Sequence, residues 1–360
     1  MIYFYNRHLF SGGAETLIYR LLVKLKERKI PACVVCEKCD DKIKTMLDNA
    51  KVEICYNCQF YKNVTKGDVI IVFSLKELLE FQIRLLNRGC KVILYILGLY
   101  TLSLQRLNNH KTLLKLIRPI MGKYIAREII HSRIIFIDRI SAENAEVFYK
   151  NIFNVPNESI FPLPIEVDES LDELKLDNLN RDVFSILSIA RADFPFKGYL
   201  KGLIEECTVL NKEKALSLTI ISYGEGMKEV MKWVESAKRD GFSRIKIVGE
   251  TLYKDLDKYV IKSNLYVGMG TTVLDAAKRG IISIPVQAHT YELRGNYLFH
   301  ENPYCIGENP NHNIDHAEKL IRKVINMSDE GYMRAKIESS NAVRKIYSID
   351  AFMNKFMKII

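Results

Sequence analysis

Short apolar runs alternate with amphipathic helical patterns along most of the chain. Runs typical of buried strands come first, at residues 2–5, 32–36, 52–56, 68–73, 91–97 and 133–138. A helical pattern follows the first run and places Leu17, Leu21 and Leu25 on one stripe. Strands and helices that alternate in this way predict a parallel sheet with helices on both faces.

The same alternation begins again in the second half of the chain. Strands are predicted at residues 184–189, 218–222 and 245–248. Residues 264–286 then read as a strand, a glycine turn, a short helix and another strand. Thr272 is expected to cap this helix, because Asp275 follows at the spacing of a capping box. Free amides and the positive end of the helix dipole predict a place for phosphate here.

A proline-punctuated segment followed by an acidic, polar stretch separates the two halves, and 360 residues are too many for one core. We therefore predict an α/β protein of two Rossmann-like, doubly wound domains that face each other across a cleft. The expected parts are an N-terminal domain at 1–165, a linker at 166–182, a C-terminal domain at 183–326 and helices at 327–360. The last helix is expected to pack back on the N-terminal domain.

Composition adds little to this picture. Hydrophobic content of 48% with 27% charged residues is ordinary for a globular protein. The net charge of +10 permits an anionic partner without choosing one. Nucleic acid is disfavoured, because the basic residues form no platform interleaved with aromatic residues. No apolar run approaches the length of a membrane span, and the N-terminus reads as a strand rather than a signal peptide, so we expect a cytoplasmic protein.

The segment 101–133 is strongly basic. It carries seven Lys or Arg residues against the single acid Glu128, and apolar residues alternate with them at helical spacing. Pro119 is expected to kink or split a helix here. A basic amphipathic helix indicates contact with anionic lipid at the inner face of the plasma membrane. A solvated helix face over the core is an equally good interpretation.

The cysteines allow two interpretations. Cys36, Cys39, Cys55 and Cys58 form two CxxC pairs, a spacing compatible with a zinc ribbon. The segment between the pairs contains a full helix pattern rather than a short knuckle. We therefore favour buried, reduced thiols on two strands and expect no metal site.

Four motifs in order resemble the family 4 glycosyltransferases of the GT-B fold. They are Gly12-Gly13-Ala14-Glu15, Arg191 with Lys197-Gly198, Gly224-Glu225-Gly226, and the run from Gly268 to Gly280. The resemblance implies a retaining, metal-independent transfer of a sugar from a nucleotide-sugar donor to an acceptor, with no cofactor. It also implies an acceptor-side N-terminal domain and a donor-binding C-terminal domain. Many members build bacterial surface polysaccharides, such as capsule or lipopolysaccharide, on a lipid carrier.

The chemistry of the transfer agrees with the roles that the resemblance implies. Negative charge builds up on the departing diphosphate, so fixed positive charge is needed there, and Arg191 and Lys197 are the expected catalytic residues. Gly12 and Gly13 would let a backbone approach the diphosphate or the acceptor. The resemblance implies that Asp275 binds the ribose hydroxyls of the nucleotide. His8 is the candidate residue on the acceptor side. The remaining expected donor-binding residues are Gly224, Glu225, Gly268, Met269, Gly270, Thr271 and Thr272.

The chain also departs from the family pattern. The family places a second acid eight positions before Asp275, and this chain has Val267 there. Relatives often carry a histidine after the strand at 91–97, where this chain has Leu97-Gly98-Leu99-Tyr100. The loop from Arg191 to Lys197 is also one residue longer than expected.

The sequence therefore predicts a hexosyltransferase that uses a nucleotide-diphosphate sugar, UDP in preference to GDP. The acceptor would be a glycan or a polyprenyl-linked glycan. In the mechanism implied by the family, the leaving phosphate itself accepts the acceptor's proton. Val267 keeps open a non-catalytic nucleotide-binding partner subunit, and a GT-B nucleotide-sugar epimerase is a further alternative.

Overall fold

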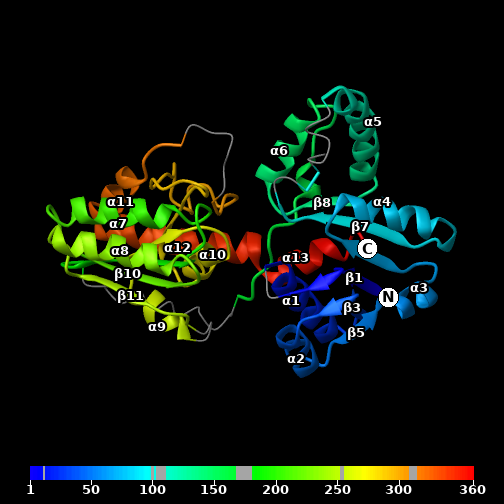
Figure 1. The fold of residues 1–360 in the computed structure, drawn as a ribbon, viewed down its shortest axis with the longest axis horizontal. Coiled ribbons are helices and arrows are strands. Elements are labelled where there is room, and N and C mark those ends of the chain that lie inside the picture. The colour runs from blue at the N-terminus through cyan, green and yellow to red at the C-terminus, as the bar shows by residue number, and fades with distance from the viewer. Residues whose placement is uncertain (11–12, 99–100, 103–110, 168–180, 252–254, 308–313) are drawn as a thin grey trace. The chain divides into compact units, whose positions relative to one another are not determined.

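The computed structural model describes residues 1–10, 13–98, 101–102, 111–167, 181–251, 255–307 and 314–360. The chain forms two compact units, which are described separately. Unit 1 comprises Met1–Glu166 and Ile349–Ile360, and unit 2 comprises Val167–Ser348 (Figure 1). The division falls at the start of the segment expected to be a linker, most of which lies outside the described residues.

Unit 1 is built on a parallel sheet. Its strands are β1 (Ile2–Tyr5), β3 (Ala32–Cys36), β5 (Glu53–Tyr56), β6 (Val69–Val72), β7 (Lys91–Ile96) and β8 (Ile134–Phe136). They lie in the order β5-β3-β1-β6-β7-β8, which is the doubly wound Rossmann arrangement. Strands β2 (His8–Leu9) and β4 (Lys38–Cys39) form a separate small pair. The strands predicted in this half are confirmed.

Helices cover both faces of this sheet, and each face has its own core. Alternate residues of β1 point to opposite cores: Tyr3 and Tyr5 join one, Ile2 and Phe4 the other. The helices are α1 (Gly13–Glu27), α2 (Asp41–Asn49), α3 (Asn57–Asn63), α4 (Leu75–Arg84), α5 (Lys111–Ile130), α6 (Arg139–Phe148) and α13 (Ile349–Phe356), with 3-10 turns at Leu86–Arg88 and Asn157–Ser159.

Unit 2 repeats the arrangement with a shorter sheet. Its strands are β9 (Phe184–Arg191), β10 (Leu216–Tyr223), β11 (Ile245–Val248), β12 (Leu265–Gly268) and β13 (Ile282–Pro285), in the parallel order β11-β10-β9-β12-β13. Its helices are α7 (Tyr199–Leu210), α8 (Met227–Arg239), α9 (Asp257–Val260), α10 (Thr271–Ala277), α11 (Glu318–Ile325) and α12 (Asp329–Tyr347). The prediction of two Rossmann-like domains is confirmed.

The helices after residue 326 divide between the two units. Tyr332 of α12 is buried in the core of unit 2, and its hydroxyl donates to the Asn264 carbonyl at 2.7 Å. Helix α13 instead belongs to unit 1, where the Ile349 amide donates to the Ile165 carbonyl at 2.9 Å. The end of the chain is therefore part of the N-terminal core.

One aromatic side chain anchors α13. Phe352 is 4% exposed, and its ring centroid lies 5.7 Å from that of Phe161 and 6.0 Å from that of Tyr95. At the helix surface, the Asp350 carboxylate contacts Arg28 at 2.8 Å. Because that ion pair is largely exposed, the buried apolar side chains of α13, Phe352 among them, supply most of its binding.

We expect Phe352→Ala to destabilise unit 1 by about 3–5 kcal/mol, because it removes a buried aromatic ring and leaves a cavity. Urea unfolding followed by circular dichroism measures the change. Met357→Ala, one residue beyond the end of α13 at a side chain that is 37% exposed, is the control and should change stability by less than about 0.5 kcal/mol. Equal midpoints for the two variants would show that the Phe352 ring does not stabilise the unit.

Candidate functional site

The candidate site lies where the strand order of unit 2 reverses. Strands β9 and β12 are neighbours in the sheet, although the connection between them passes through β10 and β11. Arg191 is the last residue of β9 and Gly268 is the last residue of β12. Ligands of open parallel sheets bind at the carboxyl ends of the strands at such a reversal. Two of the predicted motifs therefore meet at the same edge.

The loop after β9 is held by its own backbone. The Lys197 amide donates to the Asp193 carbonyl at 2.7 Å, and the Gly198 amide donates to the Pro195 carbonyl at 3.0 Å. The Lys197 ammonium lies 4.6 Å from the centre of the Phe196 ring, a cation–π distance. A Cβ at Gly198 would lie 2.6 Å from the Thr290 carbonyl oxygen, so only glycine fits after this lysine.

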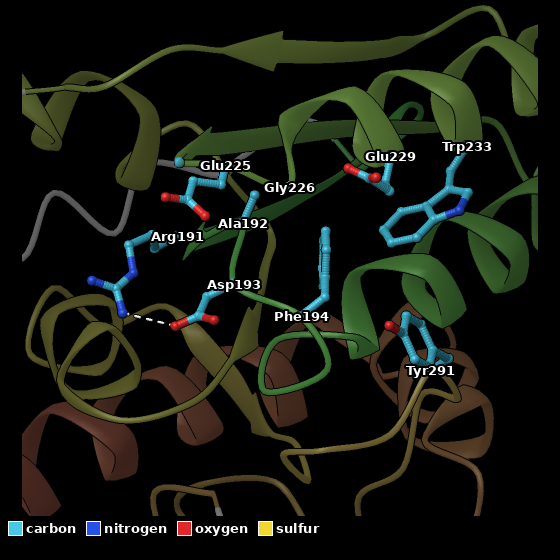
Figure 2. Close-up of a pocket in the computed structure, with 10 residues that line it drawn as sticks. Arg191, Ala192, Asp193, Phe194, Glu225, Gly226, Glu229, Trp233 and Tyr291 are labelled. Carbon is cyan, nitrogen blue, oxygen red and sulfur yellow. Dashed lines mark hydrogen bonds and ion pairs between the residues drawn. The ribbon is translucent and has the colours of Figure 1, made fainter.

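Arg191 presents its guanidinium at the surface of the site. The side chain is 60% exposed and pairs with the Asp193 carboxylate at 2.8 Å (Figure 2). The sequence reasoning missed Asp193, since an acid two residues from a cation gives no signal by itself. Because exposed ion pairs are weak, a phosphate could replace the carboxylate as partner of the guanidinium.

The turn after β12 corrects the prediction for Thr272. Helix α10 begins at Thr271, and its N-cap is Gly270, which has φ 74°. Thr272 lies inside the first turn, where its hydroxyl donates to the Met269 carbonyl at 3.1 Å and accepts from the Tyr266 hydroxyl at 2.5 Å. The predicted Thr272 cap is therefore wrong. Gly270, with its positive φ, precedes the helix as its N-cap, and the threonine hydroxyl instead holds the turn through its two hydrogen bonds.

The start of α10 presents backbone amides that the helix itself does not pair. The Gly270 amide is taken by the Ile306 carbonyl at 2.6 Å. The amides of Thr271 and Thr272 belong to the first turn, which lacks carbonyl partners within the helix. Met269 is buried, 5% exposed, so its side chain supports the turn. Gly268 needs its small size, because a Cβ there would lie 2.3 Å from the Tyr266 hydroxyl.

Asp275 is a buried acid with a buried partner. It is 5% exposed, and its carboxylate lies 3.5 Å from the Lys278 ammonium, whose side chain is 8% exposed. Val267, the position at which the family carries its other acid, is fully buried in the apolar core of unit 2. A carboxylate among these apolar side chains would be costly to bury without a partner.

The turn after β10 packs directly on the loop after β9. Gly224 has φ 113°, and Gly226 leaves room for the Phe194 ring: a Cβ at Gly226 would lie 2.4 Å from the ring atom Cε2. Between the two glycines, Glu225 is exposed. This motif therefore both places Phe194 and presents a carboxylate on the side of Arg191 (Figure 2).

A pocket of about 620 Å³ joins these two turns. Its lining consists of Arg191, Ala192, Asp193, Phe194, Gly224, Glu225, Gly226, Glu229, Trp233 and Tyr291. Figure 2 shows Arg191, Asp193 and Glu225 at one side and the aromatic residues at the other. Lys197 and Gly268 are not among the lining residues. The sequence reasoning did not find Glu229, Trp233 or Tyr291.

The predicted residues of the N-terminal half lie in unit 1. His8 is exposed in β2, with its ring centroid 5.9 Å from that of Phe10. Gly13 is the first residue of α1, and a Cβ there would meet nothing within 4 Å. Gly12 lies outside the described residues. The structure therefore places His8 and Gly13 within their own unit only.

The predicted thiols lie on strands, as expected. Cys36 and Cys55 are buried in β3 and β5, and burial raises the pKa of Cys36 to about 11. The side chain of Cys58 lies outside the described part of the chain. Among the described residues, no group of three or more His, Cys, Asp or Glu side chains could hold a metal ion.

Comparison with protein-family models and with curated proteins finds no match. Solved structures match along nearly the whole chain. A glycosyltransferase from Rickettsia africae has a TM-score of 0.71 at 13% identity, covering 99% of this chain and 97% of that one. The lipopolysaccharide outer core galactosyltransferase WaaB, in its apo form, has a TM-score of 0.63 at 12% identity, covering 100% and 99%. HepE of Anabaena, in complex with UDP and glucose, has a TM-score of 0.61 at 13% identity, covering 99% and 98%.

At such low identity the likeness shows the fold. The chain has the α/β fold of GT-B type that these glycosyltransferases share, and the predicted fold class is confirmed. The sequence resemblance to glycosyltransferases agrees with this set of structures.

We expect Gly226→Ala to displace the Phe194 ring, because the added methyl group would overlap it. The overlap should cost about 1–3 kcal/mol and change the emission of Trp233, whose ring contacts Phe194 at a centroid distance of 5.0 Å. Fluorescence measures this directly, since the chain has one tryptophan. Gly249→Ala is the matched control, because a Cβ there meets nothing within 4 Å. An unchanged spectrum for Gly226→Ala would contradict the packing of the two turns.

Proposed function

We propose that the protein is a retaining, metal-independent glycosyltransferase. It transfers a sugar from a nucleotide-diphosphate sugar, UDP in preference to GDP, to a glycan or lipid-linked glycan in surface polysaccharide synthesis. The observation that carries the proposal is the meeting of Arg191 and the start of α10 at the strand reversal of a GT-B fold. The fold match to HepE, which was solved with UDP and glucose, supports a UDP-linked donor.

The site residues would act on the leaving diphosphate. Negative charge grows on this group as the bond to the sugar breaks, and preorganised donors stabilise it without reorganising. The Arg191 guanidinium would leave the Asp193 carboxylate and bind phosphate oxygens instead. Lys197 would add a second positive charge. The amides of Thr271 and Thr272 give two further donors from the first turn of α10.

The other site residues would place the rest of the substrates. Asp275 would hold the ribose hydroxyls, since a carboxylate beside Lys278 retains acceptor capacity for a second partner. Glu225 would contact the donor sugar from the turn after β10. Gly12, Gly13 and His8 would serve the acceptor side from unit 1.

A second candidate is a non-catalytic subunit that binds nucleotide and supports a partner transferase. Val267 favours it, because this buried aliphatic side chain stands where relatives carry an acid that contacts the donor sugar. Both candidates bind nucleotide, and only the enzyme releases nucleotide from a sugar donor. The two are therefore separated by turnover rather than by affinity.

The experiment is a screen of purified protein against UDP- and GDP-sugars with membrane extract as acceptor source, with released nucleotide as the readout. We expect release from a UDP-sugar and about tenfold weaker UDP binding in Lys197→Ala, because a charge-assisted contact to phosphate is lost. Isothermal titration measures the affinity.

Lys201→Ala is the matched control, because Lys201 lies one turn further along, partly exposed in α7 and paired with Glu205. It should bind UDP as the unaltered protein does. Equal UDP affinity of the Lys197→Ala and Lys201→Ala variants would contradict the proposed contact between Lys197 and phosphate. UDP binding without release from any donor would favour the non-catalytic subunit.

We further propose that α5 contacts an anionic membrane surface at the cytoplasmic side. In the described residues, no helix combines the length and the apolar character needed to cross a bilayer. Leu116 and Ile120 are 66% and 69% exposed and lie one turn apart, and exposed Lys115 and Lys123 flank them. The expected split at Pro119 is not found, since the helix continues from Lys111 to Ile130. A continuous row of exposed apolar and basic residues suits an interfacial helix.

We expect the double variant Leu116→Gln, Ile120→Gln to bind phosphatidylglycerol vesicles about tenfold more weakly, because two side chains no longer insert between lipids. Cosedimentation measures the bound fraction. Ile83→Gln removes an equally apolar side chain that is 76% exposed on α4 and should bind as the unaltered protein does. Unchanged vesicle binding of the double variant would contradict the membrane contact and indicate that this face of α5 is only exposed to solvent.

A further inference from the structure

The pocket beside Arg191 extends beyond the residues that the proposed transfer uses. Its far end is lined by the rings of Phe194, Trp233 and Tyr291. Ring centroids lie 5.0 Å apart for Phe194 and Trp233, 6.2 Å for Phe194 and Tyr291, and 6.3 Å for Trp233 and Tyr291. Tyr291 remains 44% exposed. Aromatic surface left open inside a pocket is typical of a ligand contact.

These rings form a wall rather than a cage. The Phe194–Trp233 and Trp233–Tyr291 pairs are edge-to-face, with interplanar angles of 64° and 80°. Since the rings contact one another, no space remains between them for a quaternary ammonium group, which aromatic cages surround. A ligand can therefore only lie against the wall, with one flat apolar face.

The polar residues of the pocket restrict the ligand further. Glu229 and Trp233 are four residues apart on α8 and so lie on the same side of the helix. The carboxylates of Asp193, Glu225 and Glu229 can only accept hydrogen bonds when ionised. Among the described residues of the lining, Arg191 is the one cation, and it already pairs with Asp193. The excess of negative charge disfavours phosphate and carboxylate at this end and favours a neutral ligand that carries several donors.

We propose that this aromatic end of the pocket is a binding site for a neutral sugar ring. A pyranose has an apolar C–H face that fits against Trp233 and Tyr291, and its hydroxyl groups donate to Glu225 and Glu229. A nucleobase also has a flat face, but the diphosphate of its nucleotide would then lie near the carboxylates, which disfavours it. The sugar comes either from a free or acceptor saccharide or from the nucleotide-sugar donor. The acceptor and donor sources rest on the proposed function, and a free saccharide does not.

The single tryptophan of the chain makes the site directly observable. Emission of Trp233 is followed while maltotriose, cellotriose or lactose is added at millimolar concentration to the full-length protein. We expect a saturable change with at least one of them. Tyr291→Ala should weaken that binding by about fivefold or more, because half of the stacking surface is lost. Tyr291→Phe keeps the ring and should bind as the unaltered protein does, and Glu229→Gln should weaken binding because an ionic acceptor is lost.

Tyr304→Ala is the matched control. Tyr304 is an exposed tyrosine of the same unit, 56% exposed, and it does not line the pocket. Its removal should leave the saccharide response unchanged. The proposal is overturned if none of the three saccharides changes the emission, if only tetramethylammonium or UDP does, or if the saccharide response survives Tyr291→Ala.

Further binding measurements identify the source of the sugar and test this site separately from the proposed reaction. Competition between UDP-glucose and the saccharide, with no competition from UDP, assigns the pocket to the donor's sugar. Simultaneous binding of the saccharide and UDP-glucose, without competition between them, assigns it to the acceptor. If Lys197→Ala binds UDP normally and no donor is turned over, the proposed function fails while the saccharide response of Trp233 still decides this site.

Discussion

The arrangement of the site depends on the adjacency of β9 and β12. These strands are neighbours only because the chain reverses its order of addition to the sheet between them. Two connections then leave the sheet edge in opposite directions, and their starts meet above it. Arg191 and the Gly268 turn are therefore brought together by topology rather than by proximity in the sequence. The phosphate-binding role proposed for the second unit rests on this adjacency.

Close backbone packing keeps the loops at that edge in place. Gly198 fits against the Thr290 carbonyl, and Gly226 fits against the Phe194 ring. Both contacts leave no room for a Cβ, so the loops after β9 and β10 are positioned by what they touch. Loops fixed in this way can hold charged side chains in a constant geometry, which is what stabilising a developing charge requires.

The sequence predicted the frame of the molecule and only part of the site. Short, continuous apolar runs located the strands, and the motifs around Arg191 and Gly268 located the strand reversal. The cap at Thr272 was wrong, because a local spacing rule competes with the left-handed conformation that Gly270 supplies. Trp233 and Tyr291 could not be predicted: one is on α8 and the other follows β13, and only the fold brings their rings together.

Asp193 connects the two halves of the pocket. Its carboxylate now holds the Arg191 guanidinium, and it also lines the space beside the aromatic wall. A phosphate that takes over Arg191 releases this carboxylate as an acceptor, which makes a sugar hydroxyl a better partner for it. On both proposals, nucleotide and saccharide should thus strengthen each other's binding, and linkage requires the effect to be equal in both directions. A charge exchange at one arginine is sufficient to produce this coupling, and no movement of the sheet is needed.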